Sequence, residues 1–158
     1  MFIDESAAKT NMTRLYGRAP AGHWRTTSMI SSIRLDGTTA CMAIEGAADG
    51  DVFQAYIREI LLPTLRAGDV VIMDNLRVHK TAGTAALIES AGAEVRFLPP
   101  YSPDPDPIEK MWSKVKTLLR KAAARTHEKL LEAIAAALDA VTPEDAGNWF
   151  VSCGYNKI

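Results

Sequence analysis

Three acidic residues of this 158-residue chain stand where regular elements are expected to end or begin. Asp4 ends a short apolar run, Asp74 follows the continuous apolar run Val70–Met73, and Glu109 falls in the first turn of an expected helix. Carboxylates gathered at one sheet edge bind hard, oxygen-preferring cations such as Mg²⁺ or Mn²⁺. Two such ions about 3.5–4 Å apart activate an attacking oxygen and stabilise a leaving oxygen. The acids therefore predict metal-assisted phosphoryl transfer.

Each acid also has a purely structural interpretation. An acid after an apolar strand often only marks the exit of the chain into solvent, and this applies most to Asp4. Asp74 is more specific, because open α/β sheets bind ligands beyond the carboxyl ends of their strands. Glu109 stands at the third position of a helix that Asp106 would cap and Pro107 would open, where a glutamate completes a capping box. Capping and catalysis can coexist there, since a helix N-terminus stabilises a carboxylate.

The elements that must position these acids alternate between strands and helices. Strands are expected at about residues 1–4, 28–35, 39–44, 70–73 and 94–98, with Asp36-Gly37 turning the second into the third as a hairpin. Helices are expected at about 51–63, 82–90, 107–122 and 127–141, the first with a possible capping box of Asp51 and Gln54, and Thr142-Pro143 would open a last one. This order predicts a layered α/β domain with parallel strands in its second half.

The distribution of charge bears on a nucleic-acid partner. A net charge of −1 argues mildly against one, but residues 6–35 contain basic residues and no acid, and residues 110–129 contain a single acid, Glu128. Such stretches can neutralise phosphates while the rest of the domain stays acidic, although a solvated helix face has the same composition. The candidate DNA-binding residues are Arg14, Arg18, Arg25, Lys110, Lys114 and Lys121.

Composition argues against other classes of protein. No stretch approaches the roughly 18 apolar residues of a membrane span, and the chain does not open on a signal peptide, so a cytoplasmic protein without a membrane partner is expected. Cys41 and Cys153 lie far apart in no metal-ligand spacing and are expected to be reduced thiols. No glycine-rich loop follows Asp74, which argues against a flavodoxin-like phosphate site.

Several motifs resemble those of bacterial insertion-sequence transposases related to the mariner elements. The motifs are Phe2-Ile3-Asp4-Glu5-Ser6, Val71-Ile72-Met73-Asp74-Asn75 with His79-Lys80, and Leu98-Pro99-Pro100-Tyr101-Ser102-Pro103-Asp104 followed by Pro107-Ile108-Glu109 and Trp112. The 34 residues from 75 to 108 separate the second acid from the third, which is the spacing of that family. The resemblance extends over essentially all of the chain.

The resemblance implies a ribonuclease-H-like mixed sheet flanked by helices in three layers, with Asp4, Asp74 and Glu109 as catalytic metal ligands. It implies a pair of Mg²⁺ or Mn²⁺ ions, double-stranded DNA as substrate, and a homodimer or an intact transposase subunit as partner. Water would cut the transposon ends, and the freed 3′ hydroxyl would attack target DNA in the bacterial nucleoid. Residues expected to support the metal ligands or contact DNA are Asn75, His79, Tyr101 and Asp106. For His79 a surface position at a helix start is the alternative, and for Trp112 core packing is favoured.

The chain departs from that family in three places. It starts at the first catalytic strand, so residues 1–158 would be a catalytic domain without the helix-turn-helix region that recognises transposon ends. Residues usual between segments like 17–20 and 22–24 are missing, which predicts a weakened sheet beside Asp4, and Asp106 replaces an asparagine. Two rival functions follow: another nuclease of the ribonuclease-H superfamily, or a catalytically inactive or partner-dependent fragment that only binds DNA or an intact subunit.

Overall fold

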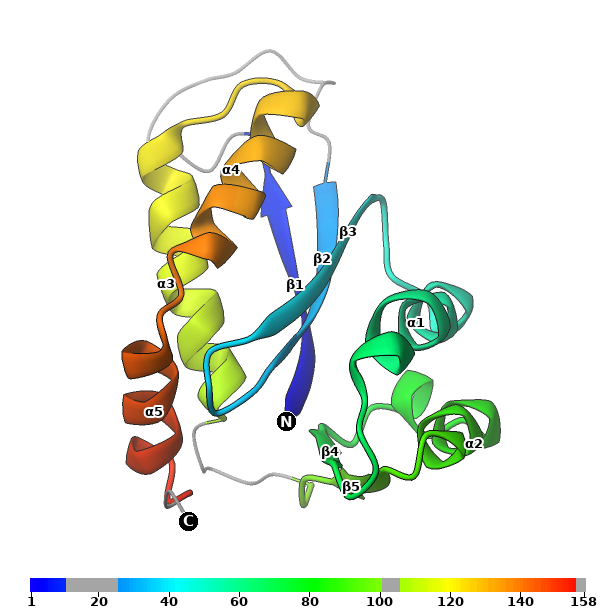
Figure 1. The fold of residues 1–158 in the computed structure, drawn as a ribbon. Coiled ribbons are helices and arrows are strands. Elements are labelled where there is room, and N and C mark those ends of the chain that lie inside the picture. Colours follow the sequence, from blue (N-terminus) through cyan, green and yellow to red (C-terminus); the bar gives the residue numbers. More distant parts are fainter. Residues whose placement is uncertain (11–25, 101–105, 156–158) are drawn as a thin grey trace.

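The computed structural model describes residues 1–10, 26–100 and 106–155, which form a mixed sheet with helices on both faces (Figure 1). The strands are β1 (Phe2–Lys9), β2 (Thr26–Ile33), β3 (Thr39–Glu45), β4 (Val70–Met73) and β5 (Glu94–Phe97), in the spatial order β3-β2-β1-β4-β5. The hairpin of β2 and β3 is antiparallel, as the turn signal predicts, and β1 is antiparallel to β2. Both β4 and β5 run parallel to β1, so the predicted layered α/β arrangement is confirmed.

The helices divide between the two faces of the sheet (Figure 1). One group consists of α1 (Gly50–Tyr56), which continues as a π-helical turn (Ile57–Leu61) and a 3₁₀ turn (Leu62–Thr64), the 3₁₀ turn η3 (Arg77–His79) and α2 (Ala82–Ser90). The other consists of α3 (Pro107–Ala122), α4 (His127–Asp139) and α5 (Pro143–Ser152). None of the helices in the described part of the chain is long and apolar enough to cross a bilayer.

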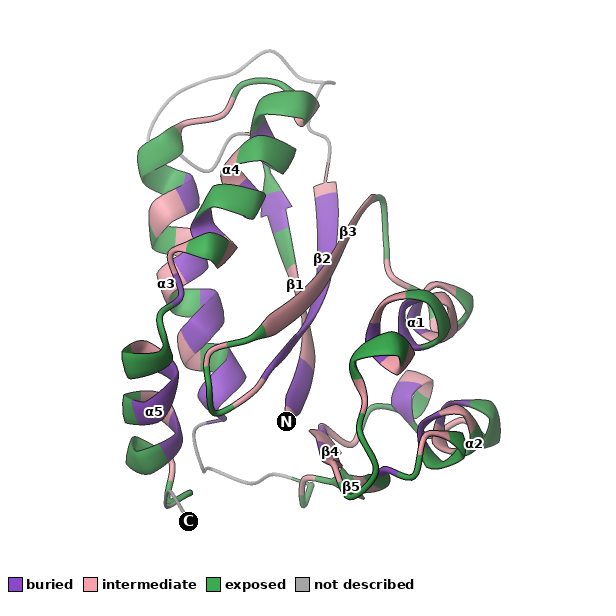
Figure 2. Cartoon of the chain, in the orientation of Figure 1, coloured by how far each residue is buried: buried purple, intermediate pink, exposed green. Residues whose placement is uncertain are grey.

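Alternate residues of β1 belong to two separate cores, because successive side chains of a strand point to opposite faces. Phe2 packs among the residues of α3, α4 and α5, whereas Ile3 packs among those of α1, its π-helical extension and α2. Both side chains are buried, and burial follows the sheet-facing sides of the helices (Figure 2). The same alternation directs Asp4 towards the α3 side and Glu5 towards the α1 side of the sheet.

Helix α3 follows the pattern that its sequence predicts. Asp106 caps it by accepting a hydrogen bond from the Ile108 amide at 3.0 Å, and Pro107 occupies the first position, where no donor is needed. The helix ends where Ala123 adopts a left-handed conformation with φ of 53°. Its apolar stripe is buried against the sheet, and Trp112 lies in that core, as its position on the stripe predicts.

Three local expectations need correction or closer definition. β1 extends to Lys9, so Asp4 lies inside the strand; antiparallel pairing with β2 continues the strand past its apolar run. Asp49, rather than the pair Asp51 and Gln54, caps α1, because its side chain accepts from the Val52 amide at 2.9 Å. The shortening expected at residues 17–24 lies outside the described residues. The pairing of β1 with β2 nevertheless runs without interruption from Phe2 to Lys9, so β1 and β2 remain paired beside Asp4.

Candidate active site

Asp4 lies in β1, and Asp74 directly follows β4, the parallel strand beside it. The pairing of β1 with β4 consists of Phe2 with Ile72 and Ile3 with Met73, and each aspartate is the next residue. Asp4 also lines an open groove of about 390 Å³ between β1 and α3, whose other wall contains Glu109. All three candidate acids therefore border the end of the sheet where β4 stops.

The electrostatics of Asp4 reflect this gathering of acids. Burial is the largest cause that raises its pKa, to about 6, and the negative charges of Asp74, Glu5 and Glu109 raise it further. The Glu5 backbone amide opposes the shift by hydrogen bonding to the carboxylate. The neighbouring carboxylates therefore add to the cost of ionising Asp4, and a bound cation would relieve that part of the cost.

A fourth carboxyl, Asp106, belongs to the same cluster. Burial is the main cause that raises its pKa, to about 7, and the charges of Asp4, Glu109 and Asp74 add to the shift, against the stabilising amide of Ile108. The side chain is buried beneath the start of α3 while Glu109 is exposed to solvent. Asp106 therefore caps the helix at an electrostatic cost.

Replacing Asp106 with asparagine is expected to stabilise the chain in the presence of a chelator. Asparagine caps a helix as well as aspartate but carries no charge. Because the folded-state pKa of Asp106 is raised, its ionisation penalty is absent below the unfolded pKa, grows as the pH rises towards 7, and is complete above it. The variant should gain on the order of 2 kcal/mol at pH 8 and almost nothing at pH 4. Thermal unfolding at both pH values measures this.

Asp49→Asn is the matched control for that experiment, since Asp49 also caps a helix but is exposed. It should change stability little at either pH. An Asp106→Asn variant whose stability follows that of the native chain across the pH range would contradict the assignment of a buried, repelled carboxylate.

Glu109 has no structural role in the described residues. The capping-box alternative requires its side chain to accept from the Asp106 backbone amide, and α3 has only the Asp106 half of that arrangement. By contrast, both halves of a capping box are present in α5, between Thr142 and Asp145. The Glu109 carboxylate instead lines the groove.

Asp74 is held through one of its two oxygens. Oδ1 accepts a hydrogen bond from the Leu76 amide at 3.2 Å and lies 2.6 Å from Nδ1 of His79, an ion-pair distance at an angle too poor for a hydrogen bond. Burial alone would raise the pKa of Asp74, but contact with the His79 ring and the Leu76 amide and the charge of His79 lower it overall. Oδ2 has no partner among the described residues.

His79 is buried between two carboxylates, which rules out the alternative of a surface histidine. Its Nε2 lies 3.1 Å from Oε1 of Glu5, on the opposite side of the ring from Asp74. Burial lowers the pKa of His79, but Asp74 and Glu5 outweigh that effect and raise it to about 9. Asn75, which follows Asp74, is half-buried in the segment that leads to η3.

The donor chemistry of this site suits a hard divalent cation, since its groups are carboxylate oxygens with a surplus of negative charge. Within the described ranges, however, no three acidic, histidine or cysteine side chains are gathered closely enough to hold one ion. The acids border one edge without forming a closed cage. Ligand binding by all three would therefore require their side chains to turn towards a common point.

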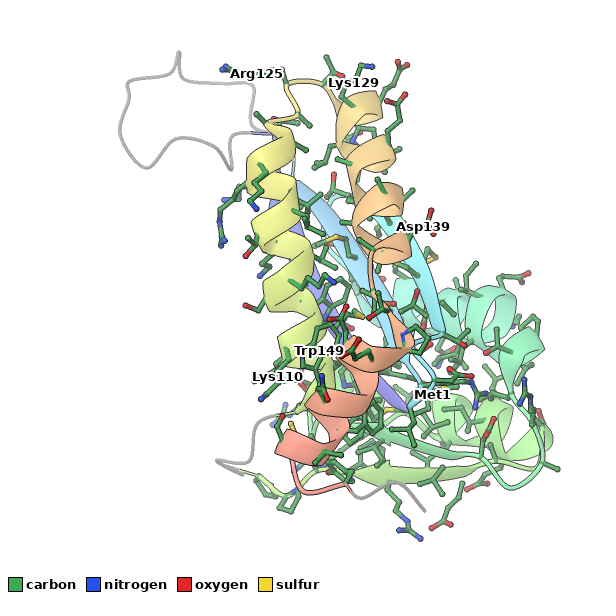
Figure 3. All side chains as sticks on the ribbon, turned by 60° about the vertical axis from the view of Figure 1, so that its left-hand side comes forward. Met1, Lys110, Arg125, Lys129, Asp139 and Trp149 are labelled. Carbon is green, nitrogen blue, oxygen red and sulfur yellow. The ribbon has the colours of Figure 1, made fainter. Side chains whose placement is uncertain are left out.

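The basic residues of α3 separate into two groups. Lys116 and Arg120 line the groove together with Ser113, on the same helix face as Glu109. Lys114 is instead paired with Asp145 at 2.5 Å, and Lys110 donates to Ser152 at 2.7 Å on the side of α5 (Figure 3). The remaining candidates are Lys121, which is exposed, and Arg14, Arg18, Arg25 and Tyr101, which lie outside the described residues.

Lys116 and Arg120 are absent from the candidates that the sequence suggests, although a signal was present. Counting from Glu109, residues 113, 116 and 120 fall at steps of four, seven and eleven, which is one face of a helix. Net charge over a segment cannot distinguish that face from its neighbours. The position of Glu109 at the groove is what identifies this helix face as the one that would meet DNA.

Comparisons with known proteins bear on the family and the fold of this chain. The family model of the DDE superfamily endonuclease matches residues 1–131. The catalytic core domain of BIV integrase has a TM-score of 0.59 and 15% identity, over 98% of this chain and 97% of that one. A chain of the simian T-cell lymphotropic virus intasome, solved in complex with PP2A regulatory subunit B56 gamma, has a TM-score of 0.56 and 12% identity over 87% of this chain. This match spans only 46% of the intasome chain, and no curated protein matches the sequence.

At these identities the structural likeness concerns the fold. The mixed five-stranded sheet with helices on both faces matches that of an integrase catalytic core, so the expected ribonuclease-H-like architecture is confirmed. The match to the endonuclease family is independent of that likeness, because it rests on the sequence, and it includes Asp4, Asp74 and Glu109.

Proposed function

This chain belongs to the DDE superfamily endonuclease family, and from that membership we propose that it is the catalytic core of a DNA transposase. The reaction would be cleavage at transposon ends followed by transfer of the freed strand to target DNA. Asp4, Asp74 and Glu109 would be the catalytic carboxylates, with Mg²⁺ or Mn²⁺ as their cations. Residues 1–158 would act as one catalytic domain.

The observation that supports this proposal best is the position of three acids from distant parts of the chain around one end of the sheet. Asp4 and Asp74 follow the last paired residues of β1 and β4, and Glu109 faces the groove from α3. Burial is the main cause of the raised pKa of Asp4, and the added repulsion from Asp74, Glu5 and Glu109 is the electrostatic counterpart of that geometry. A structural role for the charge of Glu109 is lacking in the described residues, which favours a chemical one.

The residues of the site divide the work of phosphoryl transfer between them. Bound divalent cations would supply charge neutralisation and activation of the attacking oxygen. The free Oδ2 of Asp74 and the carboxylates of Asp4 and Glu109 are the oxygens available to hold them. Lys116 and Arg120 would bind the phosphates of the strand that enters the groove, and their charge would orient it along α3. No covalent bond between protein and DNA is required.

The partners that we propose follow from the same reaction. The substrate would be double-stranded DNA, as transposon ends and as target, in a bacterial nucleoid. Because two transposon ends must be joined, a homodimer or an intact transposase subunit would complete the assembly. The proposed kinship with insertion-sequence and mariner transposases is supported by the sequence motifs around Asp4, Asp74 and Glu109.

A joining assay tests the proposed function. The native chain is incubated with a pre-nicked transposon-end duplex and a target duplex, because a pre-made nick removes the need for separate end recognition. Joined product should form with Mg²⁺ or Mn²⁺ and disappear when a chelator is added. Ca²⁺ is the matched control cation, since it prefers the same oxygen donors but accepts looser, larger coordination shells.

The other outcomes identify the rival functions. Cleavage of an RNA–DNA hybrid or a branched duplex without joining would favour a different nuclease of the ribonuclease-H superfamily. DNA binding without reaction under any cation would favour a fragment that depends on an intact subunit. The open arrangement of the acids is the observation that keeps this second candidate in the test.

A further inference from the structure

We propose that His79 is a positioning residue that joins Asp74 to β1 by bridging it to Glu5, so that the two catalytic aspartates keep a fixed separation. The inference rests on the proposed function, because it assigns Asp4 and Asp74 to one metal site. It goes further by naming the connection that holds the site together.

The need for a connection comes from the sheet itself. β1 pairs with β4 at only two positions, and the last of them, Ile3 with Met73, immediately precedes the two aspartates. The chain leaves β4 at Asp74, and the β5 side gives no further ladder there, since the last bond is from the Leu98 amide to the Met73 carbonyl. Backbone pairing between β1 and β4 therefore stops one residue before the two aspartates, Asp4 and Asp74.

The two ring nitrogens of His79 provide the connection between β1 and Asp74 that backbone pairing does not make. Nδ1 lies 2.6 Å from the Asp74 carboxylate, and Nε2 lies 3.1 Å from that of Glu5, the residue next to Asp4. Within the described part of the chain, this is the one side-chain bridge that we find between β1 and the segment 74–81. A rigid ring between two carboxylates fixes their separation more tightly than two flexible side chains would.

The ring itself is held from the α1 side. Its plane lies against Phe53, with centroids 4.4 Å apart and an interplanar angle of 33°. The segment after His79 also contacts α1, because the Gln54 side chain donates a hydrogen bond to the Thr81 hydroxyl at 3.1 Å. His79 is 0% exposed, so contact with DNA is excluded while the bridge keeps this arrangement.

Residues that orient metal ligands in this way typically change metal affinity or activity by about 10–100-fold when they are replaced. The variant His79→Phe keeps an aromatic ring against Phe53 but removes both nitrogens, so it separates bridging from packing. We expect its Mn²⁺ affinity, measured by titration calorimetry, to fall about tenfold, and the Mn²⁺ midpoint of the joining reaction to rise by the same factor. Its affinity for DNA should not change.

Two further variants sharpen the test. His127→Phe is the control, because that ring lies at the far end of the fold and only approaches Thr27 Oγ1 at 3.4 Å; its Mn²⁺ affinity should equal that of the native chain. Glu5→Gln should weaken Mn²⁺ binding less than His79→Phe, and the double variant should be no worse than His79→Phe alone. A folded His79→Phe protein with native Mn²⁺ affinity would overturn the inference.

Hydrogen exchange separates this inference from the proposed function. If the native chain neither binds Mn²⁺ nor joins DNA, the proposed function fails, but the bridge is still open to measurement. Amides of residues 74–81 should then exchange about tenfold faster in His79→Phe than in the native chain, while those of β2 and α3 stay unchanged. Equal exchange in the 74–81 segment would overturn the bridge in its own right.

Discussion

Replacing Glu109 with glutamine is expected to reduce metal-dependent joining by roughly 10³-fold without lowering stability. The substitution keeps the size and hydrogen-bonding capacity of the side chain and removes only its charge. Because Asp106 caps α3 and the Glu109 carboxylate has no partner in the described residues, the helix should remain intact. Single-turnover joining at saturating Mn²⁺, with thermal unfolding measured alongside, checks both halves of this result.

Glu144→Gln provides the comparison for that experiment. Glu144 also stands in the first turn of a helix that opens with proline, α5, but it lies outside the groove. It should leave joining unchanged. If Glu109→Gln joined DNA at the native rate, Glu109 would not be the third catalytic acid, and the assignment of the metal site would have to exclude α3.

The second large effect is expected on DNA affinity. Replacing both Lys116 and Arg120 with glutamine should weaken binding of duplex DNA by roughly 10–100-fold at low salt and reduce the salt dependence of log K by about two. Both side chains line the groove beside Glu109, where they would reach phosphates of the strand that we propose is cut. Anisotropy titrations over a range of salt concentrations measure the affinity and the slope together.

Lys110→Gln is the control on the same helix. Lys110 is bound to Ser152 on the α5 side, so its removal should change neither the affinity nor the slope. The comparison also decides between the two groups of basic residues on α3. A loss of binding in Lys110→Gln or Lys121→Gln that exceeded the loss in the double variant would place the DNA on the other faces of the helix.

Much of the fold could be predicted because local signals agreed with the tertiary arrangement. The stripe from Ile108 to Leu119 predicts α3, and Asp36-Gly37 predicts the β2–β3 hairpin. Val70–Met73 is apolar throughout, as expected for a strand that is covered on both faces. In each case the sequence signal that predicts the element is contained within about a dozen residues.

The structural features that the sequence did not predict depend on contacts between residues far apart in the chain. The extension of β1 to Lys9 depends on pairing with β2, whose partner residues follow more than fifteen positions later, so the polar residues after Asp4 gave no sign of it. The bridge made by His79 likewise joins residues separated by 74 positions. The sequence shows that a histidine is present at position 79, but it does not show which distant side chains the ring will contact in the fold.

The narrow seam between β1 and β4 has a thermodynamic consequence. Two paired positions connect the β3-β2-β1 portion of the sheet to β4 and β5, and the site spans that seam. Anything that draws Asp4 and Asp74 to a common point therefore also ties the two portions of the sheet together, and its binding energy adds to the stability of the whole, by about 2.7 kcal/mol at a hundred times its dissociation constant. Binding of such a ligand would then both assemble the active site and hold the two portions of the sheet together. The protein would therefore be most rigid when it is ready to react.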